Sequence, residues 1–169
     1  MNTTLHIRKA EEQELSLILS MLKEAAEAIK NKGLDQWHMW LNPQPGHISW
    51  IDEGLKQTEF FIVNNEENEH IGMFRLSYTD IRYWGEQTDK SGYVHSLVVR
   101  KGFSGQNMGA KILRYVENLL VIDGYDLLRL DCNASNNWLC NYYENLGFKK
   151  VGEKAMPHSL NNLYEKKLH

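Results

Sequence analysis

The 169-residue chain lacks the features that mark several large classes of protein. It has two cysteines, Cys132 and Cys140, which are too few for a disulfide framework and lack the CxxC spacing of a zinc site. We therefore expect both to be reduced packing residues, and we expect no bound metal. No apolar run approaches the length that crosses a bilayer, and the N-terminus lacks the apolar core of a secretory signal. These absences predict a soluble, cytoplasmic protein with no membrane partner.

An excess of positive charge is also missing. The 19 basic and 22 acidic residues are scattered along the chain and give a net charge of -3, so no basic footprint for nucleic acid is present. What the chain does contain is 42% hydrophobic residues, which is enough for a substantial core. We find no internal repeat or linker, and we predict a single domain over residues 1–169.

Hydrophobic periodicity predicts an alternation of strands and helices. Strands are expected at 5–8, 59–63, 70–78, 93–100, 127–132, 148–154 and 163–167, and helices at 11–32, 49–56, 109–122 and 136–145. The segments 34–48, 79–92 and 155–162 are interpreted as loops, the first of them with room for a short helix. This order predicts an α/β fold of the α+β type, in which helices flank both faces of a mixed, mostly antiparallel sheet of six to seven strands.

The most informative segment is the turn from the expected strand at 93–100 to the helix at 109–122. Gly102, Gly105 and Gly109 permit positive φ or close backbone approach, and Asn107 is among the better non-glycine residues for a left-handed conformation. Amides at the start of a helix attract an anion such as a phosphate. The turn is not a Walker loop and does not fit the dinucleotide fingerprint. A purely structural turn is the alternative interpretation.

This loop and a second motif resemble the GNAT superfamily of N-acetyltransferases. The segment Ser104–Gly109 is similar to the family's phosphate loop, [Gln/Arg]-x-x-Gly-x-[Gly/Ala], and Tyr143–Phe148 is similar to its Tyr-x-x-x-Gly-Phe ending. Asn136 precedes that tyrosine by seven residues, as the family's asparagine does. Two departures are Ser104 in place of the usual Arg or Gln, and Asn107 in place of a glycine, so the affinity for the coenzyme is left open.

The resemblance implies acetyl-CoA as the co-substrate. In the family, the strand before the loop splays from the next strand and offers main-chain groups to pantetheine, while the loop amides hold the pyrophosphate. The expected coenzyme-binding residues are Leu97, Val98, Val99, Ser104, Gly105, Gln106, Asn107, Met108, Gly109, Ala110, Asn136 and Tyr143.

The resemblance also implies direct attack of an amine on the thioester. Tyr143 is the expected acid for the thiolate, and packing within the apolar stripe of its helix is the alternative. His95 is favoured as the base because its unperturbed pKa suits proton removal near neutral pH. A structural histidine is the alternative there, with Asp80, Glu86 or a water relay as competing bases. Strict alternation places His95 on the same strand face as Leu97.

The acceptor is expected opposite the coenzyme, beside aromatic residues that favour a flat or cationic amine. The alternative is that the early tryptophans pin helices onto the sheet. We expect a small-molecule amine or a protein amine as partner, and a homodimer is compatible with the sequence. A non-catalytic acyl-CoA-binding sensor or interaction module is the competing function. The expected acceptor-binding residues are Gln36, Trp37, Trp40, Tyr78, Tyr83 and Trp84.

Overall fold

The computed structural model describes residues 4–169, which form a seven-stranded sheet with helices. The strands are β1 (His6–Lys9), β2 (Phe60–Asn64), β3 (His70–Ser77), β4 (Ser91–Val99), β5 (Leu127–Asn133), β6 (Lys149–Met156) and β7 (Ser159–Lys167). The helices are α1 (Leu15–Asn31), α2 (Pro45–Lys56), α3 (Ile81–Trp84), α4 (Met108–Ile122) and α5 (Asn137–Asn145), with short 3-10 helices at Glu12–Glu14, His38–Trp40 and Lys101–Phe103.

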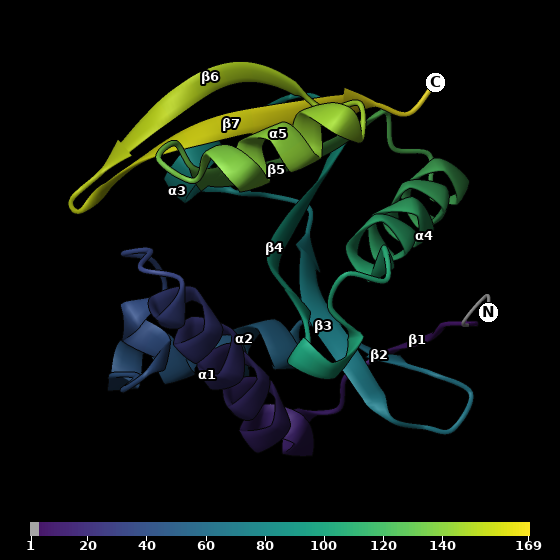
Figure 1. Cartoon of the computed structure of the whole chain (residues 1–169). Coiled ribbons are helices and arrows are strands. Elements are labelled where there is room, and N and C mark those ends of the chain that lie inside the picture. Colours follow the sequence, from purple (N-terminus) through teal and green to yellow (C-terminus); the bar gives the residue numbers. More distant parts are fainter. Residues whose placement is uncertain (1–3) are drawn as a thin grey trace. The chain divides into compact units, whose positions relative to one another are not determined.

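The strands follow the order β1-β2-β3-β4-β5-β7-β6 (Figure 1). β4 pairs with β5 in parallel, whereas β1 with β2, β2 with β3, β5 with β7 and β6 with β7 are antiparallel. The predicted mixed, mostly antiparallel α/β fold is confirmed. Contacts divide the chain into two compact units, the first comprising residues up to Leu76 with Ser96–Gly109, and the second Ser77–His95 with Ala110–His169.

In the first unit, α1 and α2 bury their apolar stripes against one face of the strands (Figure 1). Alternation along β2 sends Phe60 and Ile62 into this core, whereas Phe61 points to the other face and stacks on its cross-strand partner Phe74, with ring centroids 4.8 Å apart. The helices and strands of this core contribute, among others, Ile18, Met21, Leu22, Ile51, Leu55, Phe60, Ile62 and Met73.

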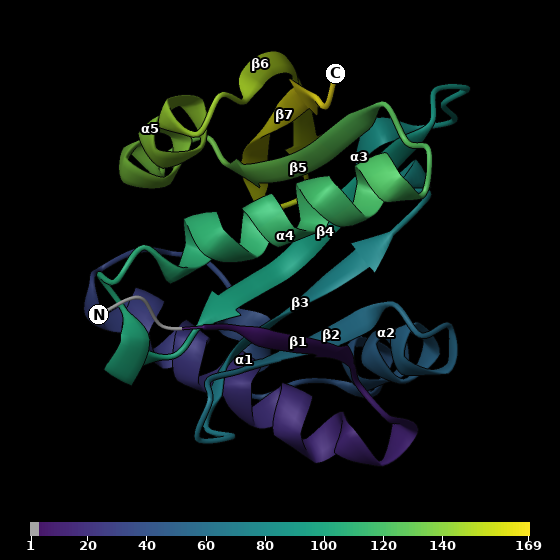
Figure 2. The same cartoon turned by 90° about the vertical axis from the view of Figure 1, so that its right-hand side faces the viewer.

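In the second unit, both longer helices contact the same face of β7. Glu117 of α4 pairs with Lys166 at 2.7 Å, and Glu144 of α5 accepts a hydrogen bond from the Tyr164 hydroxyl at 2.9 Å. Lys166 and Tyr164 are two residues apart, so their side chains lie on one face of the strand. α4 also lies against β4, where a Cβ on Gly92 would come within 2.5 Å of Leu120 (Figure 2).

The segment 79–92, expected to be a loop, contains helix α3. Asp80 caps this helix, since its Oδ1 accepts a hydrogen bond from the Tyr83 amide at 3.1 Å. The loop expectation is wrong here because four helical residues are too few to produce a recognisable hydrophobic period.

Two other expected boundaries are also wrong. α2 begins at Pro45 rather than at residue 49, because proline at the first helical position has its φ already set for a helix. The expected loop at 155–162 is a tight hairpin in which Met156 pairs with Ser159. Its two-residue turn leaves the strands β6 and β7 paired almost to their tips.

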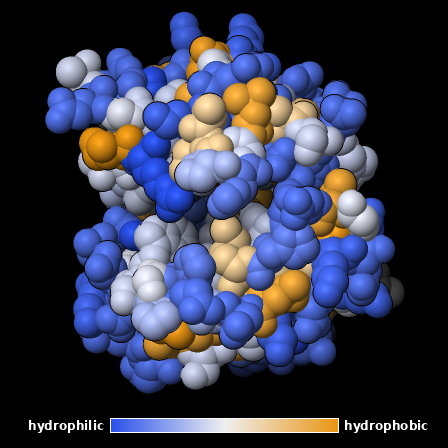
Figure 3. Space-filling view, turned by 90° about the vertical axis from the view of Figure 1, so that its left-hand side faces the viewer, coloured by the Kyte–Doolittle hydropathy of each residue, from blue (hydrophilic) through white to orange (hydrophobic). Residues whose placement is uncertain are grey.

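The helices of residues 4–169 include none that is long and apolar enough to cross a membrane. On the face drawn in Figure 3, apolar side chains lie scattered among hydrophilic ones. Isolated exposed apolar side chains of this kind are normal on a protein surface.

Candidate active site

The segment from Ser104 to Ala110 connects β4 to α4 and is exposed as far as Asn107. Gly105 has φ 79° and Asn107 has φ 61°, so both lie in the left-handed region. The left-handed conformation anticipated for Asn107 is confirmed, at the position where the GNAT motif has a glycine. The loop enters the first turn of α4, where the positive end of the helix dipole favours an anion.

β4 is interrupted at Ser96, whose φ of 53° is not that of a strand. A residue in the left-handed conformation breaks the two-residue alternation of side chains. Beyond this interruption, Val98 is buried, whereas Leu97 and Val99 are partly exposed. The expectation of strict alternation from His95 to Leu97 is therefore wrong.

β4 and β5 pair over three residues, Ser91–Tyr93 with Leu127–Arg129. β5 continues beyond this ladder to Asn133, with its other edge still paired to β7. His95 and Asp131 each follow the last β4–β5 pair by two residues. The two side chains therefore lie where the parallel pairing ends.

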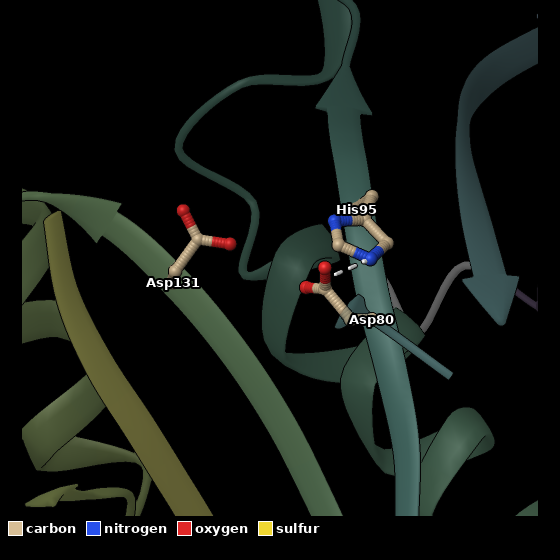
Figure 4. Close-up of side chains that lie close together, drawn as sticks. All are labelled: Asp80, His95 and Asp131. Carbon is tan, nitrogen blue, oxygen red and sulfur yellow. Dashed lines mark ion pairs between the residues drawn. The ribbon is translucent and has the colours of Figure 1, made fainter. Parts of the chain in front are cut away.

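Asp80 joins these two residues from the segment before α3 (Figure 4). One ligand atom of each of Asp80, His95 and Asp131 lies within 4.8 Å of the others. His95 Nε2 lies 3.5 Å from Asp80 Oδ2, and the Asp80 side chain is only 6% exposed. That Oδ2 atom is buried and accepts no hydrogen bond from the residues that the structure describes. We call Asp80, His95 and Asp131 the acidic cluster.

The pKa of Asp131 is raised from its usual 3.8 to about 6. Burial is the main cause, and the negative charge of Asp80 adds to it. Two groups act in the opposite direction: Asn161 donates a hydrogen bond to Asp131 Oδ2 at 2.6 Å, and the positive charge of Arg82 is nearby. The phenol of Tyr83 also lies in these surroundings. Burial is the main cause of the rise in the pKa of Tyr83, and the negative charge of Asp131 is the second cause.

Arg129 fixes the structure beside the acidic cluster, on the same face of β5 as Asp131. Its guanidinium pairs with Glu165 at 2.8 Å and Asp89 at 3.1 Å, and donates to the Tyr93 hydroxyl at 3.0 Å. It also lies 4.8 Å from the ring centroid of Trp84, which was expected to contact the acceptor. These contacts hold α3 against β5, and the acceptor contact of Trp84 stays a prediction.

Tyr143, on α5, is buried among aromatic side chains. Its ring centroid lies 5.8 Å from that of Phe148 and 6.1 Å from that of Tyr164. Burial raises the pKa of its phenol above the usual value, so the hydroxyl stays protonated at neutral pH. Proton donation by Tyr143 stays a prediction. Nearby, the Cys132 and Cys140 sulfurs lie 3.6 Å apart as free, buried thiols, which confirms the expected reduced packing cysteines.

Asn136 is the N-cap of α5, and its Oδ1 accepts a hydrogen bond from the Leu139 amide at 3.1 Å. This local role is sufficient to account for an asparagine at that position. A hydrogen bond also links the phenol of Tyr142 to the backbone of Ala110, in the first turn of α4. The sequence motif indicated Tyr143 but did not indicate Tyr142, the residue before it.

The expected acceptor residues of the first unit have different surroundings. Trp40 is buried in the core and lies 6.2 Å from Trp50 between ring centroids, so its packing interpretation is confirmed. Trp37 packs against the same core. Gln36 has a buried Nε2 atom without a hydrogen-bond partner among residues 4–169. In the second unit, Tyr78 is exposed. Acceptor contacts of these residues stay predictions.

Asp131 is the residue that sequence reasoning missed. The signal that could have revealed it is the alternation in β5, where Arg129 and Asp131 interrupt a strand of leucines. Such a strand has one apolar and one polar face.

The comparisons with known proteins agree on one family. The model of the acetyltransferase (GNAT) family matches residues 21–148. An uncharacterized N-acetyltransferase of Bacillus subtilis (strain 168), YesJ, is 27% identical over 160 residues, which cover 92% of this chain and 86% of that protein. A GNAT-family acetyltransferase of Listeria monocytogenes has a similar solved structure, with a TM-score of 0.81, 24% identity and coverage of 98% and 99% of the two chains. The aminoglycoside acetyltransferase AAC(6')-Ib, solved with coenzyme A and kanamycin, has a TM-score of 0.74 and 18% identity, with 97% and 95% coverage. The chain belongs to the acetyltransferase (GNAT) family.

Proposed function

We propose that the protein transfers an acetyl group from acetyl-CoA to a primary amine of a small molecule. The observation that carries this proposal is the end of the β4–β5 ladder, with His95 and Asp131 just beyond it. The GNAT resemblance assigns the coenzyme to such a separation of strands. Support for a coenzyme A ligand also comes from AAC(6')-Ib, a neighbour in fold that was solved with coenzyme A.

The coenzyme would bind through backbone groups. In this proposal, Leu97–Val99 pair with pantetheine, the amides of Ser104–Ala110 hold the pyrophosphate, and Asn136 contacts the coenzyme. The positive φ values of Gly105 and Asn107 favour this assignment, because they curve the loop as an anion cradle requires. The bound thioester supplies an activated acyl carbonyl.

The reaction requires one proton to leave the amine and one to reach the sulfur. The amine nitrogen forms a bond to the carbonyl carbon, and the carbon–sulfur bond breaks. His95 takes the proton of the amine, with Asp80 beside it to stabilise the imidazolium. Tyr143 gives its proton to the thiolate, since a phenol is protonated at neutral pH.

The test is release of free thiol from acetyl-CoA with a panel of amines, together with calorimetric titration of coenzyme A. Tyr143→Phe keeps the buried ring and removes only the hydroxyl. We expect it to lower kcat about 100-fold and to leave coenzyme A binding unchanged. Tyr115→Phe, on an exposed position of α4, is the matched control and should change neither.

Coenzyme A binding without thiol release from any amine would instead favour the acyl-CoA sensor. If coenzyme A does not bind, the proposed function is wrong. Equal activity of Tyr143→Phe and the control would refute the role of Tyr143 and leave it as a packing residue.

A further inference from the structure

Arg129 is a buried cation of the second unit, with a side chain that is only 5% exposed. Burial of a guanidinium is costly unless carboxylates and other acceptors surround it. Glu165 of β7 pairs with it at 2.8 Å and anchors it to the sheet. Asp89 pairs with it at 3.1 Å, and Gln87 Oε1 accepts a hydrogen bond from it at 3.3 Å. The last two partners belong to the connection between α3 and β4, so the guanidinium ties that connection to the sheet.

A further contact of Arg129 leads to Asp80. The guanidinium lies 4.8 Å from the ring centroid of Trp84, the last residue of α3. The amide of Trp84 donates to the backbone oxygen of Asp80 at 2.9 Å and closes the single turn of this helix. A helix of four residues is not stable by itself. The position of Asp80 therefore depends on the contacts that hold Trp84.

Another contact of Arg129 leads to His95. The guanidinium donates to the hydroxyl of Tyr93 at 3.0 Å, and the ring of Tyr93 meets the ring of Trp84 with centroids 5.9 Å apart. Tyr93 is the register partner of Arg129 and the last residue of β4 in the ladder with β5. His95 follows it by two residues, beyond that ladder. The same guanidinium thus fixes the part of β4 from which His95 extends.

We propose that Arg129 is a positioning residue for the base of the proposed reaction. It keeps His95 Nε2 and Asp80 Oδ2 at their separation of 3.5 Å (Figure 4). Its contact with Trp84 acts on the aspartate, and its contact with Tyr93 acts on the histidine. A lysine offers one ammonium centre, whereas the guanidinium donates from five N–H groups in a fixed plane and lies over aromatic rings. This inference rests on the proposed acetyltransferase function, in which His95 takes the proton of the amine.

The first unit offers a matched control in Arg75, which is also a buried arginine. Its guanidinium pairs with Glu59 at 2.6 Å and lies 4.2 Å from the ring centroid of Trp50. These partners belong to the first unit, whereas Asp80 and His95 belong to the second. Arg75→Lys therefore removes a buried guanidinium with the same kinds of contact and leaves the proposed base in place.

The first experiment measures kcat for release of free thiol in Arg129→Lys, Asp80→Asn, the double variant and Arg75→Lys. We expect the first two changes each to lower kcat about 10- to 100-fold, because the base is displaced or loses its partner. The double variant should be no slower than the slower single variant, since both changes disable one pair. Arg75→Lys should leave kcat unchanged. Multiplied effects in the double variant, or an equal loss of kcat in Arg75→Lys, would refute the positioning role.

The second experiment follows the imidazole of His95 by NMR without acetyl-CoA, with His95→Gln to assign its signals. Arg129→Lys should move these signals in the same direction as Asp80→Asn does, whereas Arg75→Lys should not move them. Signals that stay unchanged in Arg129→Lys would refute the positioning role. The proposed function fails on a different result, the absence of coenzyme A binding, so the two failures are distinguishable.

Tyr93→Phe decides the matter if Arg129→Lys does not fold. This change keeps the buried ring and removes only the hydroxyl to which Arg129 donates. We expect it to lower kcat about 2- to 10-fold, to move the His95 signals and to leave the affinity for coenzyme A unchanged. Wild-type kcat together with unchanged His95 signals would overturn the proposal.

Discussion

Replacement of Asp131 by asparagine should stabilise the fold at neutral pH, because it removes a buried charge. The carboxylate of Asp131 is buried, faces the charge of Asp80, and has a raised pKa. Asparagine keeps an oxygen that can accept the hydrogen bond from Asn161. The substitution therefore removes an unfavourable charge while it preserves the packing.

The magnitude follows from the pKa of Asp131, which rises from its usual 3.8 to about 6 in the fold. Each pKa unit corresponds to about 1.4 kcal/mol, so ionisation in the fold opposes stability by about 3 kcal/mol. Below pH 3.8 the side chain is protonated in both states and this loss of stability is absent. It grows as the pH rises through the folded pKa, from about 1 kcal/mol at pH 4.5 to its full value at pH 7.5.

Urea unfolding at these two pH values checks the prediction. We expect Asp131→Asn to raise the free energy of unfolding by about 1–3 kcal/mol at pH 7.5 and by less than half as much at pH 4.5. The exposed control Asp126→Asn should change it by less than about 0.5 kcal/mol at either pH. A gain that is equal at both pH values, or a loss of stability at pH 7.5, would refute the assignment of an ionised, unfavourable carboxylate.

Two further predictions concern backbone positions in the first unit. A Cβ on Gly72 would lie 2.0 Å from the backbone oxygen of Val98, so Gly72→Ala should lower the free energy of unfolding by about 3 kcal/mol or more, whereas Gly46→Ala, with nothing within 4 Å, should not lower it. Asn107 has a φ of 61°, which a β-branched residue adopts only with strain. Asn107→Val should therefore weaken coenzyme A binding and lower the free energy of unfolding by about 1–2 kcal/mol, whereas Asn107→Gly should preserve the binding and the stability. Calorimetric titration and urea unfolding measure these effects, and equal behaviour of the valine and glycine variants would contradict the second.

Long periodic elements could be predicted from the sequence because their signal is local. α4 and α5 lie within one residue of their expected bounds, and the glycines that follow them, Gly124 and Gly147, have positive φ. The helix α3 could not be predicted in the same way. It is held by tertiary contacts of Trp84 with Arg129 and Tyr93, which no local pattern encodes.

The candidate site was predictable in part for the same reason. The loop around Asn107 is contiguous in sequence, so its left-handed conformation could be expected from residue type. The acidic cluster gathers Asp80, His95 and Asp131 from three segments, and their proximity depends on the β4–β5 register. Asp131 was missed because the leucines of β5 identify that strand as core, although Arg129 and Asp131 alternate with them on a polar face.

The two faces of β5 lead to the two groups that the proposed reaction assigns to opposite proton transfers, His95 and Tyr143. Asp131 faces Asp80 and His95, whereas the adjacent Cys132 points to the other face, where it contacts Cys140 of α5, the helix that carries Tyr143. The β4–β5 ladder ends at Tyr93 and Arg129, before Asp131 and Cys132 are reached. In the proposed reaction, the base and the acid act on one thioester beyond the end of this short parallel pairing.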